Sequence, residues 1–484
     1  MHLTELSLLA LAAKLADKST TSVQATQAAL ERIAQVQPHL NAFICVDEEG
    51  ALAAAKAADE RRCQGQARSI LDGVPVALKD NIFAKGLQTT CASRMLHNFV
   101  APTDAAVTSL LREAGMVLLG KLNMDEMAMG SSTTSGFFGP ARNPYALGHS
   151  PGGSSGGAAA AVAARASWAA LGTDTGGSIR QPASFCNVVG LKPSFGRVSR
   201  RGVVAYASSM DQVGPMARTV KDVAALLGVL AQPDKEDVLC CPRAGGSYTQ
   251  GIERGIRGMR VGLWKESLEG ADEEVAARVR EAAKACERLG AQVVEVSFAL
   301  SRLAPLAYAI VSAAEASSNL ARFDGIRYGH AHVGAQNLRE LYNKSRGEGF
   351  GQAVKNKLVL GTFVLSAGHY EVFFERAAQL RTLLCEEINR TLQTVDVLLG
   401  PVAPTPAFAL EFKPTPAQSA ALDSHTVLAN LTGLPALSLP YGFSTAGLPV
   451  GVQLMGKAFE EGCLLRCAYA LEQDSPSFQK APAL

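Results

Sequence analysis

Two serines, Ser154 and Ser178, each lie in a glycine-rich turn, and twenty-four residues separate them. The run Gly152–Gly157 (GGSSGG) surrounds the first serine, and Gly176 and Gly177 precede the second. Glycine reaches backbone angles that are closed to other residues, so such turns can aim several N–H groups at one point. Stabilising the oxyanion of an acyl-transfer reaction requires this arrangement of donors. The two turns therefore predict a serine-dependent acyl-transfer site.

Three simpler interpretations of these turns compete with catalysis. Glycine-rich turns before helices often serve only as loops. Neither turn continues into the Gly-Lys-Ser/Thr sequence of a phosphate-binding loop. A nucleophile elbow needs Gly-x-Ser-x-Gly, which the sequence at 153–156 does not provide. Two such turns on either side of one expected helix are harder to explain as plain loops than one turn alone.

A serine nucleophile needs a base, and the strongest candidate in this chain is Lys79. The lysine ends the apolar stretch Gly73–Leu78 and precedes Asp80 and Asn81. This pattern is typical of a buried strand whose carboxyl end carries a polar side chain, where open α/β sheets place their ligands. A strand-end lysine that points to solvent is the simpler alternative. The histidines have no sequence environment that singles one out as a base; they lie at positions 2, 39, 97, 149, 330, 332, 369 and 425.

Burial of Lys79 would change its acid–base chemistry. A low-dielectric environment disfavours the ammonium form, lowers the pKa and leaves a neutral amine that can accept a proton. Lowering the pKa by three units costs about 4 kcal/mol, which other interactions of the fold must offset.

Three segments resemble the amidase signature family: ALKDN at 77–81, GGSSGG at 152–157 and TDTGGSIRQPA at 173–183. The catalytic unit of that family is a serine, a second serine on a cis peptide bond, and a lysine. By this resemblance Ser178 corresponds to the acylated nucleophile, Ser154 to the bridging serine and Lys79 to the base. The resemblance implies a proton relay from Ser178 through Ser154 to Lys79, attack on an amide carbonyl and release of ammonia.

The resemblance also assigns roles around the second turn. The N–H groups of Thr175, Gly176, Gly177 and Ser178 correspond to the oxyanion hole of the family. Asp174 and Arg180 flank this turn, and we expect them to hold the loop by ionic hydrogen bonds rather than to take part in the chemistry.

Further segments resemble one branch of the family, the A subunit of the glutamyl-tRNA(Gln)/aspartyl-tRNA(Asn) amidotransferase. That branch hydrolyses glutamine for an enzyme that converts Glu-tRNA(Gln), and in many organisms Asp-tRNA(Asn), to the amidated form. The resemblance implies a heterotrimeric ligase of protein biosynthesis with subunits B and C. It implies no cofactor in this chain, ATP and Mg²⁺ acting on a partner subunit, and charged tRNA bound mainly by that partner. The segments are 121–132, 190–200, 315–325, 345–351 and 429–435.

A glutamine pocket follows from the same matching, with one departure. The family pairs an arginine with the substrate carboxylate and an aspartate with its α-amino group; these positions fall on Lys357 and Asp423, and a pocket tyrosine falls on Tyr308. Lysine keeps the charge but loses the bidentate fork, so we expect weaker glutamine binding or specificity for another amide. Met129 and Ser131 correspond to residues that line the pocket near the nucleophile, with ordinary loop packing as the alternative.

The composition fits a large soluble α/β protein: 484 residues, 48% hydrophobic, 19% charged, with 45 glycines. A net charge of +2 without a basic stripe argues against strong nucleic acid binding by this chain alone. Ten cysteines without a CxxC pair fit a reducing cytoplasm. No apolar run is long enough to span a bilayer, and the N-terminal segment predicts an amphipathic helix rather than a signal peptide.

Strand and helix patterns alternate along the chain and predict a central mixed β-sheet covered by helices on both faces, the amidase-signature fold. We expect a single amidase domain over 1–484 with the signature core at about 70–220, and surface connections at 232–258 and 401–416. The alanine-rich stretch 158–170 predicts a buried core helix between the serine turns. Strands are expected at 259–264, 291–296, 395–400, 436–440 and 450–455, the last two antiparallel, and a helix at 272–289.

Three functions remain open from the sequence. The first is the glutaminase subunit of a tRNA-dependent amidotransferase. The second is a free-standing amidase that acts on a small-molecule amide, which the lysine at position 357 leaves open. The third is a scaffold whose active site has decayed, and the presence of Lys79, Ser154 and Ser178 argues against it.

Overall fold

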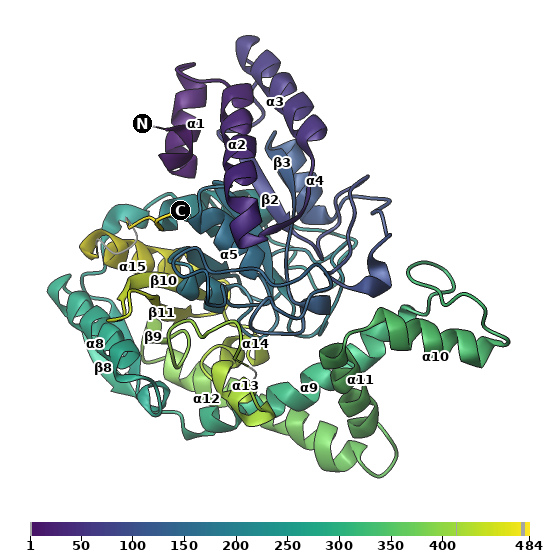
Figure 1. The fold of residues 1–484 in the computed structure, drawn as a ribbon. Coiled ribbons are helices and arrows are strands. Elements are labelled where there is room, and N and C mark those ends of the chain that lie inside the picture. The colour runs from purple at the N-terminus through teal and green to yellow at the C-terminus, as the bar shows by residue number, and fades with distance from the viewer. Residues whose placement is uncertain (1, 413, 476–479) are drawn as a thin grey trace.

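A computed structural model describes residues 2–412, 414–475 and 480–484. Its centre is one mixed sheet of eleven strands in the order β1-β3-β2-β4-β6-β5-β10-β11-β9-β7-β8, with helices on both faces (Figure 1). Strands from the beginning and the end of the chain share this sheet, because β5 pairs antiparallel with β10 near the middle. The strands are β1 Phe43–Val46, β2 Pro75–Lys79, β3 Val117–Leu122, β4 Ala169–Asp174, β5 Val189–Lys192, β6 Gln212–Ala217, β7 Arg260–Trp264, β8 Gln292–Val296, β9 Val397–Pro401, β10 Ala436–Phe443 and β11 Pro449–Gly456.

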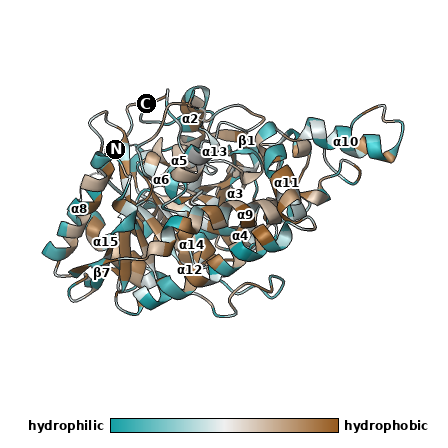
Figure 2. Cartoon of the chain, turned by 90° about the horizontal axis from the view of Figure 1, so that it is seen from below, coloured by the Kyte–Doolittle hydropathy of each residue, from teal (hydrophilic) through white to brown (hydrophobic). Residues whose placement is uncertain are grey.

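Fifteen α-helices are assigned in the described part of the chain and surround the sheet. In Figure 1, α10 and α11 extend to one side, away from the sheet. Figure 2 shows α10 as mostly hydrophilic, whereas α14 in the body is mostly hydrophobic. The helices are α1 Leu8–Ala16, α2 Ser22–Leu40, α3 Glu48–Cys63, α4 Ala106–Glu113, α5 Gly156–Ala163, α6 Arg180–Phe185, α7 Val220–Leu230, α8 Glu273–Arg288, α9 Ala304–Asn319, α10 Leu338–Gly349, α11 Gln352–Val364, α12 Arg376–Leu392, α13 Pro416–Leu422, α14 Val427–Leu431 and α15 Glu461–Asp474.

At β9 the two faces of the sheet belong to different apolar cores, because side chains of a strand alternate between faces. In β9, Val397 and Leu399 belong to the larger core, which also contains α8 and α15, whereas Leu398 belongs to a second core with α9 and α12. All residues of β2, β3 and β4 are buried, as is typical of strands covered on both faces. The predicted mixed sheet with helices on both faces is confirmed.

The strands predicted in the second half of the chain correspond to β7, β8, β9, β10 and β11, and β10 pairs antiparallel with β11 as expected. The predicted helix at 272–289 is α8, and the Asp272 side chain caps it by accepting from the Glu274 N–H at 2.9 Å. The predicted N-terminal helix is present as α1. Within the described residues, no helix has both the length and the apolar character needed to cross a bilayer.

The helix predicted over 158–170 is wrong in its second half. α5 ends at Ala163, Arg165 takes a left-handed conformation with φ 62°, and the Ala166 N–H donates to the Ala161 carbonyl at 2.9 Å. These features end a helix in a Schellman motif. The chain then enters β4, which pairs with β2 and β6. Sheet pairing in the core overrides the helix propensity of alanine here.

Candidate active site

Lys79 is the last residue of β2, and its side chain is fully buried. Because β2 pairs in parallel with β4, the lysine lies beside Thr173, near the end of that strand. Its Nζ lies 2.7 Å from Ser154 Oγ, 3.0 Å from Thr173 Oγ1 and 3.3 Å from the Thr173 carbonyl oxygen. The side chains predicted as base and bridging serine are therefore in direct contact.

Burial lowers the pKa of Lys79 from its ordinary value of 10.5 to about 7. The negative charges of Asp125, Asp174 and Asp211 act in the opposite direction but do not cancel the effect of burial. Near neutral pH a substantial fraction of the lysine is thus a neutral amine, which is the form a general base requires.

The contacts of Lys79 accommodate this neutral form. The Thr173 carbonyl can only accept a hydrogen bond, and Thr173 Oγ1 already accepts from Asn81 Nδ2 at 3.0 Å. A neutral amine can direct both of its N–H groups to Thr173 and its lone pair to the hydroxyl of Ser154. The Ser154 proton then has an acceptor at 2.7 Å.

Ser154 lies in the turn before α5, and the peptide bond from Gly153 to Ser154 is cis. The Asp125 N–H donates to the Ser154 carbonyl at 3.3 Å. The Ser155 N–H donates to the Ser178 carbonyl at 3.1 Å. The two serine turns are therefore hydrogen-bonded to each other, and a contact between the Ser154 and Ser178 hydroxyls stays a prediction.

The turn that carries Ser178 follows β4 directly and is held by the Asp174 carboxylate. This carboxylate accepts from the Gly177 N–H at 2.8 Å and from the Ile179 N–H at 3.2 Å, and Arg180 donates to both of its oxygens at 3.0 Å. Burial raises the pKa of Asp174, but the charge and hydrogen bonds of Arg180, the Lys192 charge and the Asn430 hydrogen bond together outweigh burial and hold the pKa below its ordinary value. The expectation that Asp174 and Arg180 hold this loop by ionic hydrogen bonds is confirmed.

One of the four N–H groups assigned to the oxyanion hole, that of Gly177, donates to Asp174. Across residues 2–412, 414–475 and 480–484, the N–H groups of Thr175, Gly176 and Ser178 have no acceptor. Thr426 Oγ1 donates to the Gly176 carbonyl at 2.6 Å and so fixes the peptide plane that follows. The Gly177 N–H therefore stabilises the turn, and an oxyanion hole formed by the other three N–H groups stays a prediction.

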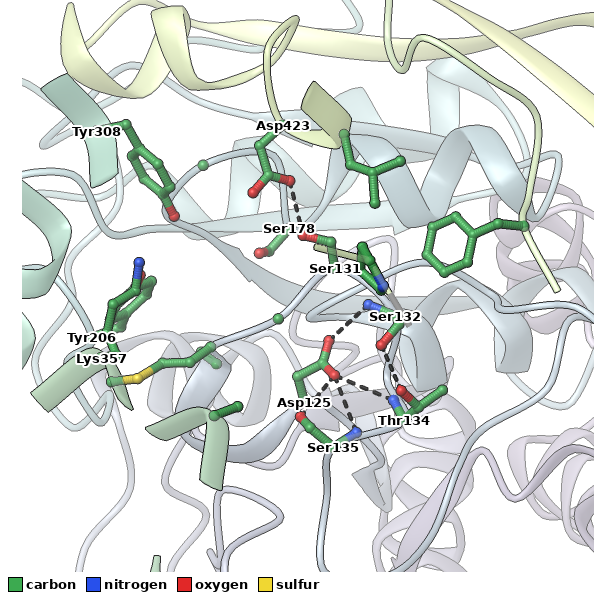
Figure 3. Close-up of a pocket in the computed structure, with 18 of the residues that line it drawn as sticks. Asp125, Ser131, Ser132, Thr134, Ser135, Ser178, Tyr206, Tyr308, Lys357 and Asp423 are labelled. Atoms are coloured by element: carbon green, nitrogen blue, oxygen red, sulfur yellow. Dashed lines mark hydrogen bonds between the residues drawn. The ribbon is translucent and has the colours of Figure 1, made fainter. Parts of the chain in front are cut away.

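A cavity of about 440 Å³ opens beside Ser178. This size suits a small-molecule ligand. Figure 3 shows Ser178, Ser131 and Asp423 together on one side of the cavity, with Lys357 on another. The residues that the sequence assigns to substrate binding all line the cavity: Met129, Ser131, Tyr308, Lys357 and Asp423.

The cavity holds opposite charges on separate elements. Lys357 on α11 lies with its Nζ 5.9 Å from the centre of the Tyr308 ring and 3.4 Å from Ser312 Oγ. Asp423 follows α13 and accepts from Ser131 Oγ at 2.8 Å. Burial raises the pKa of Asp423 to about 6, against the opposing effects of the Ser131 hydrogen bond and the Lys357 charge. An ammonium and a carboxylate on different walls can bind the two charged ends of an amino acid.

Two buried aspartates support the site and were not predicted as site residues. The Asp125 carboxylate accepts backbone N–H groups from each residue of 132–135, at 2.8–3.4 Å, and so holds the loop that follows Ser131. Asp211 accepts from Thr175 Oγ1 at 2.6 Å and from the Tyr206 N–H at 2.8 Å. Asp125 lies within segment 121–132, but its role depends on a loop that folds back onto it. No local sequence pattern around Asp211 indicates its contact with Thr175, which lies thirty-six residues away.

The sheet, the buried lysine and the paired serine turns define an α/β enzyme with a serine–lysine site. The sequence model of the protein family described as Amidase matches residues 24–465 of this chain. The chain belongs to the Amidase family.

Relatives and solved structures agree with this assignment. The chain is 52% identical to the A subunit of the glutamyl-tRNA(Gln) amidotransferase of Myxococcus xanthus (strain DK1622), with 100% of each chain covered. It is 48% identical to the protein of the same name from Geobacter sp. (strain M21), again over 100% of both chains. The crystal structure of the A subunit of the Thermotoga maritima glutamyl-tRNA(Gln) amidotransferase is similar with a TM-score of 0.81 and 39% identity, covering 98% of this chain and 96% of that one. The native peptide amidase from Stenotrophomonas maltophilia is similar with a TM-score of 0.85 and 33% identity, covering 98% of each chain.

Proposed function

We propose that this chain is the glutaminase subunit of a tRNA-dependent amidotransferase. The observation that carries the proposal is the contact of 2.7 Å between Lys79 and Ser154 beside a cavity that presents Lys357 and Asp423. A free amino acid with a carboxamide side chain offers a carboxylate to the lysine, an ammonium to the aspartate and an amide to Ser178. Full-length similarity to proteins named as the A subunit of glutamyl-tRNA(Gln) amidotransferase supports glutamine as that amino acid.

In the proposed reaction Lys79 takes the Ser154 proton while Ser154 takes the Ser178 proton. Ser178 Oγ then attacks the carboxamide carbon, and the N–H groups of Thr175, Gly176 and Ser178 stabilise the oxyanion. The C–N bond breaks as the relay returns the proton to nitrogen, so ammonia leaves and a glutamyl ester remains on Ser178. Water, deprotonated through the same relay, cleaves this ester to glutamate and restores the serine.

The proposed assembly places the remaining chemistry on other chains. Subunits B and C form a cytoplasmic heterotrimer with this chain, and charged tRNA binds mainly to the partner subunit. That partner uses ATP and Mg²⁺ to activate the carboxyl group of Glu-tRNA(Gln), or of Asp-tRNA(Asn), for attack by ammonia. The modest net charge of +2 on this chain supports tRNA binding elsewhere.

A second candidate function is a free-standing amidase. Lysine at position 357 lacks the bidentate fork that fits a carboxylate, and the chain is 33% identical to a peptide amidase over 98% of its length. This alternative predicts full activity on neutral amides without partner subunits.

One assay separates the two functions. Ammonia release is measured from glutamine and from propionamide, with and without candidate partner subunits, ATP and charged tRNA. The glutaminase proposal expects release from glutamine that partners stimulate, and loss of that release by up to about 10⁶-fold in Ser178→Ala. Turnover of propionamide without turnover of glutamine under any condition supports the free-standing amidase instead. Full activity of Ser178→Ala contradicts both.

A further inference from the structure

Glu126, the residue after Asp125, is a carboxylate that the proposed reaction does not use. It is only 3% exposed. Ser93 Oγ donates to its Oε1 at 2.6 Å, and the Gly351 N–H donates to its Oε2 at 2.9 Å and to its Oε1 at 3.1 Å. The carboxylate thus connects two parts of the chain that lie 225 residues apart.

Gly351 is the N-cap of α11, the helix that carries Lys357. The first N–H groups of a helix lack partners within the helix and carry partial positive charge, so a carboxylate stabilises this end. Gly351 has no side chain that could cap the helix, and Glu126 supplies an acceptor from the body of the protein. Lys357 follows six residues later, about 9 Å along the helix axis.

Ser93 and Glu126 contact the chain between α10 and α11, the two helices of the arm that projects from the body (Figure 1). Ser93 Oγ also lies 3.3 Å from the Gly349 carbonyl oxygen, and the His330 N–H donates to the Met95 carbonyl at 2.8 Å. In this group of contacts, Glu126 supplies the negatively charged acceptor. This attachment, together with the packing of α11 against α9, therefore contributes to the position of Lys357 relative to the sheet.

Asp125, the residue before Glu126, stabilises another wall of the cavity. Asp125 holds the loop after Ser131, and Ser131 donates to Asp423. Directly after Glu126, Met127 and Ala128 take left-handed conformations with φ of 52° and 61°. Residues other than glycine rarely adopt this conformation, and such strain clusters at ligand-binding sites.

We propose that Glu126 is a positioning residue: by anchoring the N-terminus of α11, its carboxylate sets the distance from Lys357 to Ser178 that a substrate carboxylate and carboxamide must match. Asp125 and Glu126 together hold the two walls of the cavity, one through the Ser131 loop and one through α11. This inference rests on the proposed hydrolysis of glutamine.

Two substitutions disturb the contact between Glu126 and Gly351, one at each residue. Glu126→Ala removes the carboxylate. Gly351→Ala keeps it, but a Cβ at Gly351 would lie 2.4 Å from Glu126 Oε2, while the glycine φ of −71° suits alanine. Gly347→Ala is the matched control, because a Cβ there meets nothing within 4 Å.

Steady-state ammonia release is measured from glutamine and from propionamide, which has no carboxylate for Lys357. We expect Glu126→Ala and Gly351→Ala to raise the KM for glutamine about tenfold or more while kcat changes less than about threefold. The kcat/KM for propionamide should stay within about twofold of wild type, and Gly347→Ala should resemble wild type on both substrates. Glu126→Gln keeps one acceptor oxygen and should give an intermediate KM.

A double-mutant comparison tests whether the effect passes through Lys357. In a Lys357→Met background, Glu126→Ala should leave the KM for glutamine unchanged within about twofold. Equal losses on glutamine and propionamide, or effects that simply add in the double variant, overturn the inference. If Glu126→Ala does not fold, as judged by its thermal melt, Gly351→Ala and Glu126→Gln carry the test. Wild-type protein that releases no ammonia from glutamine refutes the proposed function and this inference with it; active wild type with unchanged variants refutes the inference alone.

Discussion

Replacing Lys79 by methionine tests whether burial lowers the pKa of this amine to near 7. Burial lowers the pKa of this lysine from 10.5 to about 7. At about 1.4 kcal/mol for each pKa unit, the folded state loses about 4 kcal/mol at pH 7 relative to an unperturbed lysine. Methionine fills similar space without a charge, and it gives up the hydrogen bonds to Ser154 and Thr173. We therefore expect Lys79→Met to unfold at higher urea concentration at pH 7 and to release no ammonia.

The pH dependence makes this prediction specific. The unfolded chain keeps the lysine proton up to about pH 10.5, whereas the folded chain releases it near pH 7. Between these values the unfolded state binds more protons, so this group makes wild-type stability rise with pH by about 1.4 kcal/mol per pH unit. Below pH 7 both states are protonated, and the contribution no longer changes. The stability advantage of Lys79→Met should thus shrink by about 2–3 kcal/mol between pH 7.5 and 9.5.

The assay is equilibrium urea unfolding followed by the fluorescence of the buried Trp168 and Trp264, at both pH values. Lys192 is also buried with its pKa lowered to about 7, but it is present in both proteins and cancels from the difference. In parallel, kcat/KM of the wild type for glutamine should fall about tenfold per pH unit between pH 7 and 6 and level off above pH 7. Stability curves that stay parallel between wild type and variant would refute the reasoning, as would substantial activity in Lys79→Met.

Three further predictions concern the pocket and the core. Lys357→Arg should lower the KM for glutamine about three- to tenfold, because the guanidinium offers two parallel hydrogen bonds to a carboxylate; an unchanged KM means that this residue does not contact the carboxylate. Since burial raises the pKa of Asp423 to about 6, the carboxylate proposed to bind the substrate ammonium becomes protonated below that pH. The KM for glutamine should then rise about tenfold per pH unit below 6, with the KM for propionamide as the constant reference. Ala160→Leu should destabilise the protein by about 1–3 kcal/mol in urea unfolding and lower kcat, because α5 is fully buried there between the serine turns; normal stability would contradict close packing of this helix.

Several features of the site could be predicted from the sequence because local patterns encode them. The apolar run before Lys79 predicts a buried strand that ends in a lysine, and the structure has that strand as β2. The helical pattern at 272–289 predicts a helix, and the structure has it as α8 with Asp272 as its N-cap. The positions of Tyr308, Lys357 and Asp423 came from family resemblance, and the structure brings all three to one cavity.

Other features depend on contacts between distant segments and could not be read locally. The helix expected over 158–170 fails because β4 pairs with β2 and β6, which lie elsewhere in the sequence. Asp125 and Asp211 look like ordinary acidic residues until loops fold against them. The donation of the Gly177 N–H to Asp174 is likewise a property of the folded turn.

The sequence by itself determined the chemistry this protein can perform, because the reacting groups are side chains and their types are encoded directly: two serines in glycine-rich turns and a lysine at a strand end. Tertiary structure alone decided the protonation of that lysine and the separation of the charges in the pocket. Both depend on burial and on distances between segments, and these exist only once the eleven-stranded sheet and its helices have assembled.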